Sequence, residues 1–125
     1  MAMAPQLEVP KCALTLLNNL YEIERKLAMH GDPGNAARNI EKMKDAFGEV
    51  GGIFERYCLF IEDPMGQPFK ETRTDLEVSI SGKGTNNLVV IEVIKPIIRV
   101  GGADFSRVVQ KGIVVVQSKD KGKSK

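Results

Sequence analysis

Apolar residues in the first half of the chain recur with the spacing of an amphipathic helix. Between Cys12 and Met29 they fall alternately three and four residues apart, with charged residues between them. This heptad spacing is typical of a helix that packs against another helix. The sequence therefore predicts a first helix over residues 12–29, with an apolar stripe formed by Ala13, Leu16, Leu20, Ile23 and Leu27.

A turn and a second heptad pattern follow. The residues from His30 to Asn35 include two glycines and a proline, a composition that ends helices. From Asn35 the same spacing predicts a second helix reaching Tyr57, with a stripe formed by Ala36, Ile40, Met43, Phe47, Val50, Phe54 and Tyr57. Three glycines at positions 48, 51 and 52 interrupt this stripe. Each costs about 1 kcal/mol relative to alanine inside a helix, so they weaken the helix or admit a neighbouring backbone.

A hairpin of two such helices cannot cover both sides of its own apolar seam. Two hairpins that pack together would bury it as a four-helix bundle, which predicts a homodimer. The expected dimer interface consists of Leu16, Leu20, Ile23, Leu27, Ile40, Met43, Phe47, Val50 and Phe54. The alternative is that the seam packs on the second half of the same chain.

After Tyr57 the helical spacing ends, and short segments follow that are apolar, β-branched or alternating with a period of two, as is typical of strands. The expected strands are Cys58–Ile61, Leu76–Ile80, Leu88–Lys95, Ile98–Val100 and Arg107–Gln117. Pro96 has no amide hydrogen and should interrupt the pairing between strands. The predicted fold class is α+β: a helical hairpin that dimerises into a four-helix bundle, followed by a small all-β domain. The expected parts are an N-terminal extension (1–11), the hairpin (12–58), the β-domain (59–117) and a disordered basic tail (118–125).

The charge of the chain is concentrated at its end. The formal net charge is +2, from 18 Lys and Arg against 16 Asp and Glu, and four of the lysines lie in the last seven positions. A nucleic-acid-binding face is therefore not expected. No apolar run has the roughly 20 residues that cross a membrane, and no secretory signal opens the sequence. We expect a cytoplasmic protein with reduced cysteines, the alternative being export by another route with a Cys12–Cys58 disulfide.

Residues with catalytic potential are sparse. His30 is the one histidine and lies in the predicted turn, and the spacings CxxC, HExxH and HxH are absent. The glycine-rich segments match neither GxxxxGK[ST] nor GxGxxG. The adjacent Glu62 and Asp63 lie at a turn, where solvation explains them. The sequence predicts that the protein is not an enzyme and that it uses no metal or cofactor.

The β half carries short motifs that resemble the GrpE family, the nucleotide exchange factors of DnaK-type chaperones. Gly66-Gln67-Pro68-Phe69 resembles the family's Gly-Glu-Pro-Phe, and Val78-Ser79-Ile80 resembles the end of its His-Glu-Ala-Val-Ser strand. Val90-Ile91-Glu92-Val93 resembles Val-Val-Glu-Val, and Arg107-Val108 matches the Arg-Val that precedes an apolar strand. With the hairpin, the resemblance covers roughly residues 12–118.

The sequence also departs from the family's pattern. Lys42 falls near a helical glycine that the family uses to bind the chaperone, and Asp75 stands where the strand histidine would be. Pro96-Ile97 replaces a Lys-Gly at a strand start. The sequence begins almost at the hairpin, so the family's long preceding stalk helix has no counterpart in it.

The resemblance implies a dimeric co-chaperone that binds the nucleotide-binding domain of a DnaK-type chaperone through its β-domain. By position it implies that Phe69, Ile94 and Arg107 contact this partner. Core packing is the alternative for Phe69 and Ile94, and an ordinary surface role is the alternative for Arg107. A function of another class also stays open: a diverged dimeric adaptor that holds a protein or peptide by strand addition, without exchange activity.

Overall fold

The computed structural model describes residues 8–102 and 104–119, which form two helices followed by six strands. The helices are α1 (Lys11–His30) and α2 (Ala36–Phe47). The strands are β1 (Cys58–Glu62), β2 (Leu76–Ser81), β3 (Leu88–Lys95), β4 (Ile97–Gly101), β5 (Ser106–Gln110) and β6 (Gly112–Ser118). This confirms the predicted α+β class. The single chain shows two helices, and a four-helix bundle would require a second copy.

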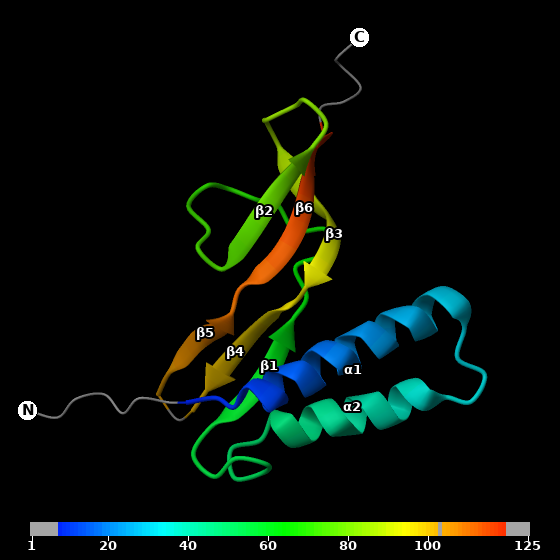
Figure 1. Ribbon diagram of the computed structural model, residues 1–125, viewed down its shortest axis with the longest axis vertical. Coiled ribbons are helices and arrows are strands. Elements are labelled where there is room, and N and C mark those ends of the chain that lie inside the picture. Colours follow the sequence, from blue (N-terminus) through cyan, green and yellow to red (C-terminus); the bar gives the residue numbers. More distant parts are fainter. Residues whose placement is uncertain (1–7, 103, 120–125) are drawn as a thin grey trace, which may run out of the picture.

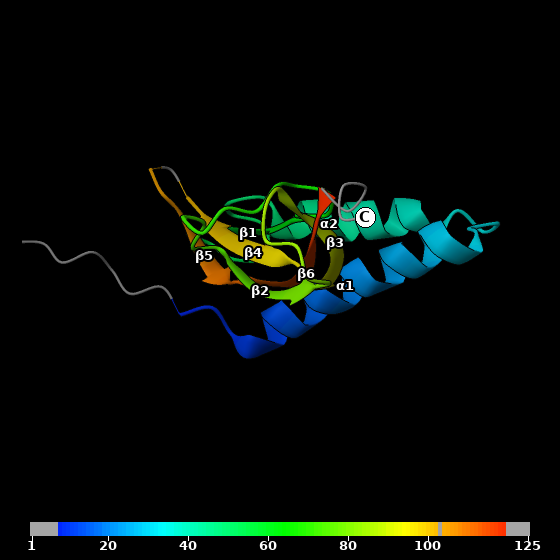
Figure 2. The ribbon, with the colours of Figure 1, turned by 90° about the horizontal axis from the view of Figure 1, so that it is seen from above.

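The strands form two three-stranded sheets, shown in Figure 1. The lower sheet has the order β1-β4-β5 and is antiparallel throughout. The upper sheet has the order β2-β6-β3, with β2 parallel and β3 antiparallel to the central β6. The helical hairpin lies beside the lower sheet, and both views show its turn projecting away from the strands (Figures 1 and 2).

Besides the long segment that leads from β1 to β2, the chain passes between the two sheets twice, each time within one residue. Pro96 separates β3 from β4, as its missing amide hydrogen predicted. Lys111 separates β5 from β6, so the single strand expected over 107–117 is wrong. At the second passage a Cβ on Gly112 would lie 2.9 Å from Leu76 Cδ2 and 3.0 Å from Ile97 Cγ1. The glycine therefore allows the two sheets to approach each other closely.

The predicted turn between the helices is confirmed, and its residues end the first helix and cap the second. Gly31 ends α1 with φ +100°, and its N–H donates to Leu27 O at 2.9 Å. The Asp32 carboxylate accepts hydrogen bonds from the N–H groups of Ala36 (2.6 Å) and Ala37 (2.9 Å). A carboxylate at this position satisfies free N–H groups and the positive end of the helix dipole, so α2 begins where the sequence indicated.

The second helix is shorter than the heptad spacing predicted. It ends at Phe47, where the Gly48 N–H donates to the carbonyls of Lys44 and Asp45 at 3.0 Å. Residues 48–57 contain turns and bends but no helix. The predictions that the second helix reaches Tyr57 and that the helical hairpin reaches residue 58 are therefore wrong. Phe54 and Tyr57 instead stack on each other, with ring centroids 4.6 Å apart.

Part of the predicted dimer seam packs against the chain's own lower sheet. The core residues of this lower cluster are Ala13, Leu17, Leu20, Ile40, Phe47, Tyr57, Leu59, Ile98 and Val100, with Leu27 and Phe54 partly buried against them. The alternative left open by the sequence therefore accounts for Leu20, Ile40 and Phe47. In the single chain, Leu16, Ile23, Met43 and Val50 are exposed.

A second core lies under the upper sheet and includes Tyr21 of α1. Along β6 the residues alternate between buried and half-buried, so one face of this sheet is covered and the other is open. Ser118 is buried at the end of β6 and its hydroxyl donates to Asn86 O at 2.6 Å. The sequence predicted that Ser118 belongs to a disordered tail, and this prediction is wrong. Residues 120–125 of the predicted tail lie outside the described residues.

Replacing Gly112 with alanine should destabilise the protein by about 1–3 kcal/mol, because the added methyl group overfills the contact between the sheets. Gly34→Ala is the matched control, since nothing lies within 4 Å of a Cβ there. Its stability should be unchanged or slightly higher. Urea unfolding of both variants measures the difference, and equal stabilities would contradict the close approach at Gly112.

Candidate partner-binding site

Phe69, the first of the predicted contact residues, lies mainly against the core. It follows Pro68 in the segment before β2, and its N–H donates to Leu88 O at 2.8 Å. Its side chain is half-buried and packs against the upper core. The backbone bond and the packing fix its position, and they favour the core alternative that the sequence left open.

Ile94, the second, lies near the end of a strand. It is the seventh residue of β3, and a shift in register lies between Val93 and Lys95. This β-bulge leaves its side chain 52% exposed, so core packing is wrong for Ile94.

Arg107, the third, is exposed on β5 and pairs with Val100 of the lower sheet. Its guanidinium lies 5.9 Å from the centre of the Phe105 ring, the geometry of a cation–π contact. Phe69 and Ile94 belong to the upper sheet, so the structure does not bring the three residues into one site.

Arg107 has other neighbours that form a site at the end of the β4–β5 hairpin. We define the hairpin-tip site as Gly102, Phe105 and Arg107, whereas Gly101 and Phe60 lie on the opposite face of the sheet. A Cβ on Gly102 would lie 2.2 Å from the Phe105 ring, so this ring rests directly on the glycine. A Cβ on Gly101 would lie 3.2 Å from the Phe60 ring. The β4–β5 hairpin points away from the α1–α2 turn (Figure 1).

The hairpin-tip site has the composition of a protein contact rather than of a catalytic centre. Phe105 is 39% exposed, and Arg107 is also exposed. Exposed aromatic and arginine side chains on a strand framework are the usual anchors of protein interfaces. The sequence analysis named Arg107 and did not name Phe105. The signal for Phe105 was its position two residues before Arg107, which places both side chains on one face of a strand.

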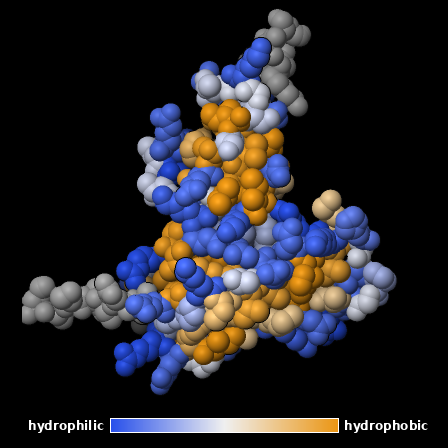
Figure 3. Space-filling view, in the orientation of Figure 1, coloured by the Kyte–Doolittle hydropathy of each residue, from blue (hydrophilic) through white to orange (hydrophobic). Residues whose placement is uncertain are grey.

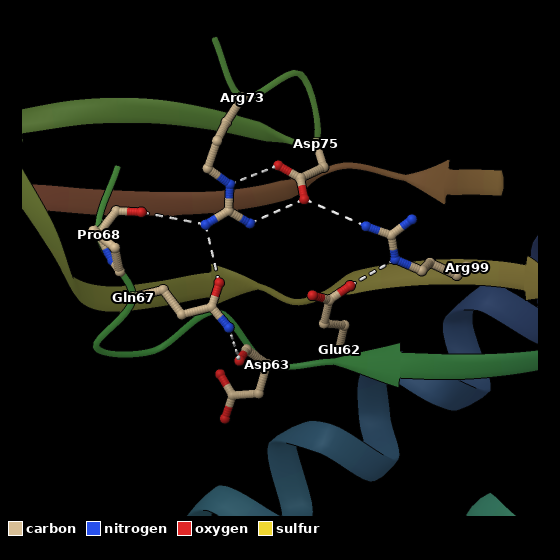
Figure 4. A network of polar contacts seen from close by, with 7 residues as sticks. All are labelled: Glu62, Asp63, Gln67, Pro68, Arg73, Asp75 and Arg99. Atoms are coloured by element: carbon tan, nitrogen blue, oxygen red, sulfur yellow. Dashed lines mark hydrogen bonds and ion pairs between the residues drawn. The ribbon is translucent and has the colours of Figure 1, made fainter. Parts of the chain in front are cut away.

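A network of polar contacts fixes the two sheets relative to each other (Figure 4). Asp75, just before β2, accepts two hydrogen bonds from Arg73, at 3.0 and 2.9 Å. The same carboxylate accepts a bond of 3.4 Å from Arg99 on β4. Arg99 also donates to Glu62 at the end of β1, at 2.6 Å. Through Asp75 the start of the upper sheet is therefore tied to two strands of the lower sheet.

The surroundings of Asp75 favour its charged form. The hydrogen bonds from Arg73 lower the pKa of the Asp75 carboxyl below its ordinary value and outweigh its partial burial, which acts in the opposite direction. Arg73 also donates to Gln67 Oε1 at 2.9 Å and to Pro68 O at 3.3 Å. The network thus also holds the segment that carries Phe69.

Helix α1 makes its own contacts with the upper sheet and the segment before it. The Tyr21 hydroxyl donates to Asp63 Oδ1 at 3.1 Å. Burial, with the nearby Asp63 charge, raises the pKa of Tyr21 to about 12, so the hydroxyl keeps its proton and remains a donor. Arg25 donates to the Val93 carbonyl of β3 and lies 5.5 Å from the Tyr21 ring centre.

The outer surface of the hairpin carries two further features. Leu16 and Ile23 of α1, Met43 of α2 and Val50 in the turn after α2 are each between 45% and 55% exposed, and we call these four side chains the outer apolar face. Figure 3 shows apolar residues gathered along the hairpin and over the upper sheet. Lys42 is exposed on α2 beside Arg38.

Within residues 8–102 and 104–119, no group of three or more His, Cys, Asp and Glu residues is arranged to hold a metal ion. His30 is exposed, and Cys12 and Cys58 are both free thiols. Neither helix of this described part is long and apolar enough to cross a membrane. Comparison with protein-family models, with curated proteins and with solved structures finds no match to this chain.

The Asp75 network should make stability depend on pH in acid. Because folding lowers the pKa of Asp75, its stabilisation is complete above the ordinary value of 3.8 and is lost as pH falls through the folded value. Asp75→Asn should cost about 1–3 kcal/mol at pH 7, the range for bonds to charged groups. The difference from the parent should shrink as the pH falls below 3.8. Urea unfolding at several pH values measures it, with exposed Glu77→Gln as the control; a difference independent of pH would contradict the role of the charge.

Proposed function

We propose that this protein is a GrpE-like co-chaperone, a homodimer that accelerates ADP release from a DnaK-type chaperone by binding its nucleotide-binding domain through the β-domain. The observation that carries the proposal is the order and exposure of the parts. A helical hairpin with an exposed outer apolar face is followed by two small sheets that present arginine and aromatic side chains. This is the arrangement that the resemblance implied, and it offers surfaces for association rather than groups for bond chemistry.

The mechanism requires a rigid surface with a preference for one state of the partner. An exchange factor binds the open form of the ATPase more tightly than the closed form, and only this difference in affinity shifts the equilibrium. Changing a population from 1:99 to 99:1 needs about 5.5 kcal/mol. In this proposal Phe105 and Arg107 are the anchors that contribute most of this difference in binding free energy. Asp75 and Arg99 hold the sheets in one arrangement, so binding energy is not spent on ordering them.

Dimerisation through the outer apolar face completes the proposal. Figures 1 and 2 show the α1–α2 turn extending beyond the sheets, so strands of the same chain do not cover the far half of the hairpin. Ile23 and Met43 are exposed on this hairpin, and Glu24 and Lys44 join the two helices through an ion pair of 3.0 Å. A second hairpin packed on this face would bury the exposed apolar side chains as a four-helix bundle.

The dimer is tested by light scattering after size exclusion, which should give twice the monomer mass at micromolar concentration. Ile23→Glu combined with Met43→Glu should produce a folded monomer, because both side chains are exposed in the single chain and charges oppose burial in a dimer. Ile80→Glu, at an equally exposed site on β2, is the control and should remain dimeric. A monomeric parent protein would contradict the four-helix bundle.

Exchange is tested by the release of fluorescent ADP from a DnaK-type chaperone. The parent protein should accelerate release, and Phe105→Ala and Arg107→Ala should each weaken binding by more than about 1 kcal/mol, roughly fivefold, as for interface anchors. Both variants should stay folded and dimeric. Phe69→Ala distinguishes the two roles considered for Phe69, core packing and partner contact. Lost stability indicates core packing, whereas weakened binding by a stable protein supports partner contact. Unchanged ADP release with the folded parent protein would contradict the proposed function.

A further inference from the structure

The strand β1 has a free edge. In the part of the chain that the structure describes, β1 pairs only with β4, through five consecutive residue pairs without a shift in register. The outer strands β3 and β5 differ in this respect, because two register shifts interrupt β3 and one interrupts the pairing of β5, whereas the outer strand β2 is also regular. A regular free edge presents backbone donors and acceptors that can pair with another extended segment. By regularity, β1 and β2 are therefore the two outer strands suited to strand addition, and the groove described next lies beside β1.

A groove of about 330 Å³ runs beside this edge, between β1 and the end of α2. It is lined by Leu17, Lys44, Asp45, Gly48, Glu49, Leu59, Phe60 and Ile61. Leu59, Phe60 and Ile61 are consecutive in β1, and successive side chains of a strand point to opposite faces of the sheet. A groove lined by all three residues therefore cannot lie on one face alone. It follows the backbone edge of β1, which the three residues share.

The floor of the groove is apolar and already formed. Leu17 and Leu59 are fully buried members of the lower core, so they are held in place without a ligand. Phe60 and Ile61 lie beside them and are more exposed. Such a floor favours an apolar side chain from every second residue of an added strand.

The rim of the groove is negatively charged. Asp45 and Glu49 are exposed, whereas the Lys44 ammonium is already paired with Glu24 at 3.0 Å and Glu41 at 3.3 Å. The carboxyl end of α2, where a helix dipole is negative, also faces this region. The unbalanced charge therefore favours basic residues in a ligand.

We propose that the free edge of β1 and the groove beside it bind an extended basic peptide by strand addition, with apolar residues alternating with lysine or arginine. The backbone edge supplies affinity, the apolar floor takes one set of side chains, and Asp45 and Glu49 attract the other set. This activity goes beyond nucleotide exchange and does not depend on it. It also specifies which edge could serve the adaptor function that the sequence left open.

The test uses a fluorescent peptide, acetyl-Lys-Val-Lys-Val-Lys-Val-amide, and the parent protein in fluorescence anisotropy. Saturable binding is expected, and the peptide Glu-Val-Glu-Val-Glu-Val should bind at least about tenfold more weakly because its charges oppose the rim. Methylating alternate backbone nitrogens of the lysine peptide should abolish binding, because it removes the donors that pair with β1.

Matched variants separate the groove from general charge. Asp45→Lys with Glu49→Lys should weaken binding at least about tenfold, whereas Glu71→Lys with Glu77→Lys, at exposed sites outside the groove, should change it less than about twofold. NMR should show the largest amide shifts in residues 58–62. The proposal is overturned by no binding at about 1 mM peptide, by equal losses in both variant pairs, by unchanged binding of the methylated peptide, or by amide shifts confined to other strands.

Discussion

The junction between the two sheets is the constraint on which the rest of the structure depends. The polypeptide crosses it at Pro96 and again at Lys111, and each crossing takes a single residue. Gly112 permits the close approach there, and its N–H donates to the Asp75 carbonyl at 3.0 Å. The Asp75 carboxylate then binds Arg99 of the other sheet. Sterics, a backbone bond and charge therefore act at one place, and together they define how one sheet stands relative to the other.

Helix α1 extends the effect of this junction to the surfaces of the molecule. Leu17 lies in the lower core and Tyr21, one turn later, lies in the upper core. Arg25, after another turn, bonds the Val93 carbonyl. One face of a single helix thus contacts both sheets, while its other face keeps apolar residues exposed. A partner copy on that outer face would therefore hold both β-domains at defined positions, which a differential binding mechanism requires.

The parts that depend on local sequence were predictable, and the parts that depend on pairing were not. The β-branched run from Leu88 to Lys95 predicted the bounds of β3, because this composition is local to the strand. The heptad spacing continued past Phe47 because Val50 and Phe54 happen to keep it, although glycines end the helix. The break at Lys111 has no pattern of its own and follows from the change of sheet. The resemblance named Arg107 as a contact residue. Phe105 carries no such motif, and its position depends on the contact between its ring and Gly102, which the sequence does not reveal.

The central claim is that the β4–β5 hairpin meets the nucleotide-binding domain of a DnaK-type chaperone. Hydrogen–deuterium exchange of the protein, with and without the nucleotide-free domain, tests this contact most directly. The account predicts slower exchange for amides of residues 101–107 when the domain is added, and a return to the free rate when ATP releases it. Unchanged exchange in this segment, with slower exchange confined to the helices or to the upper sheet, would contradict it.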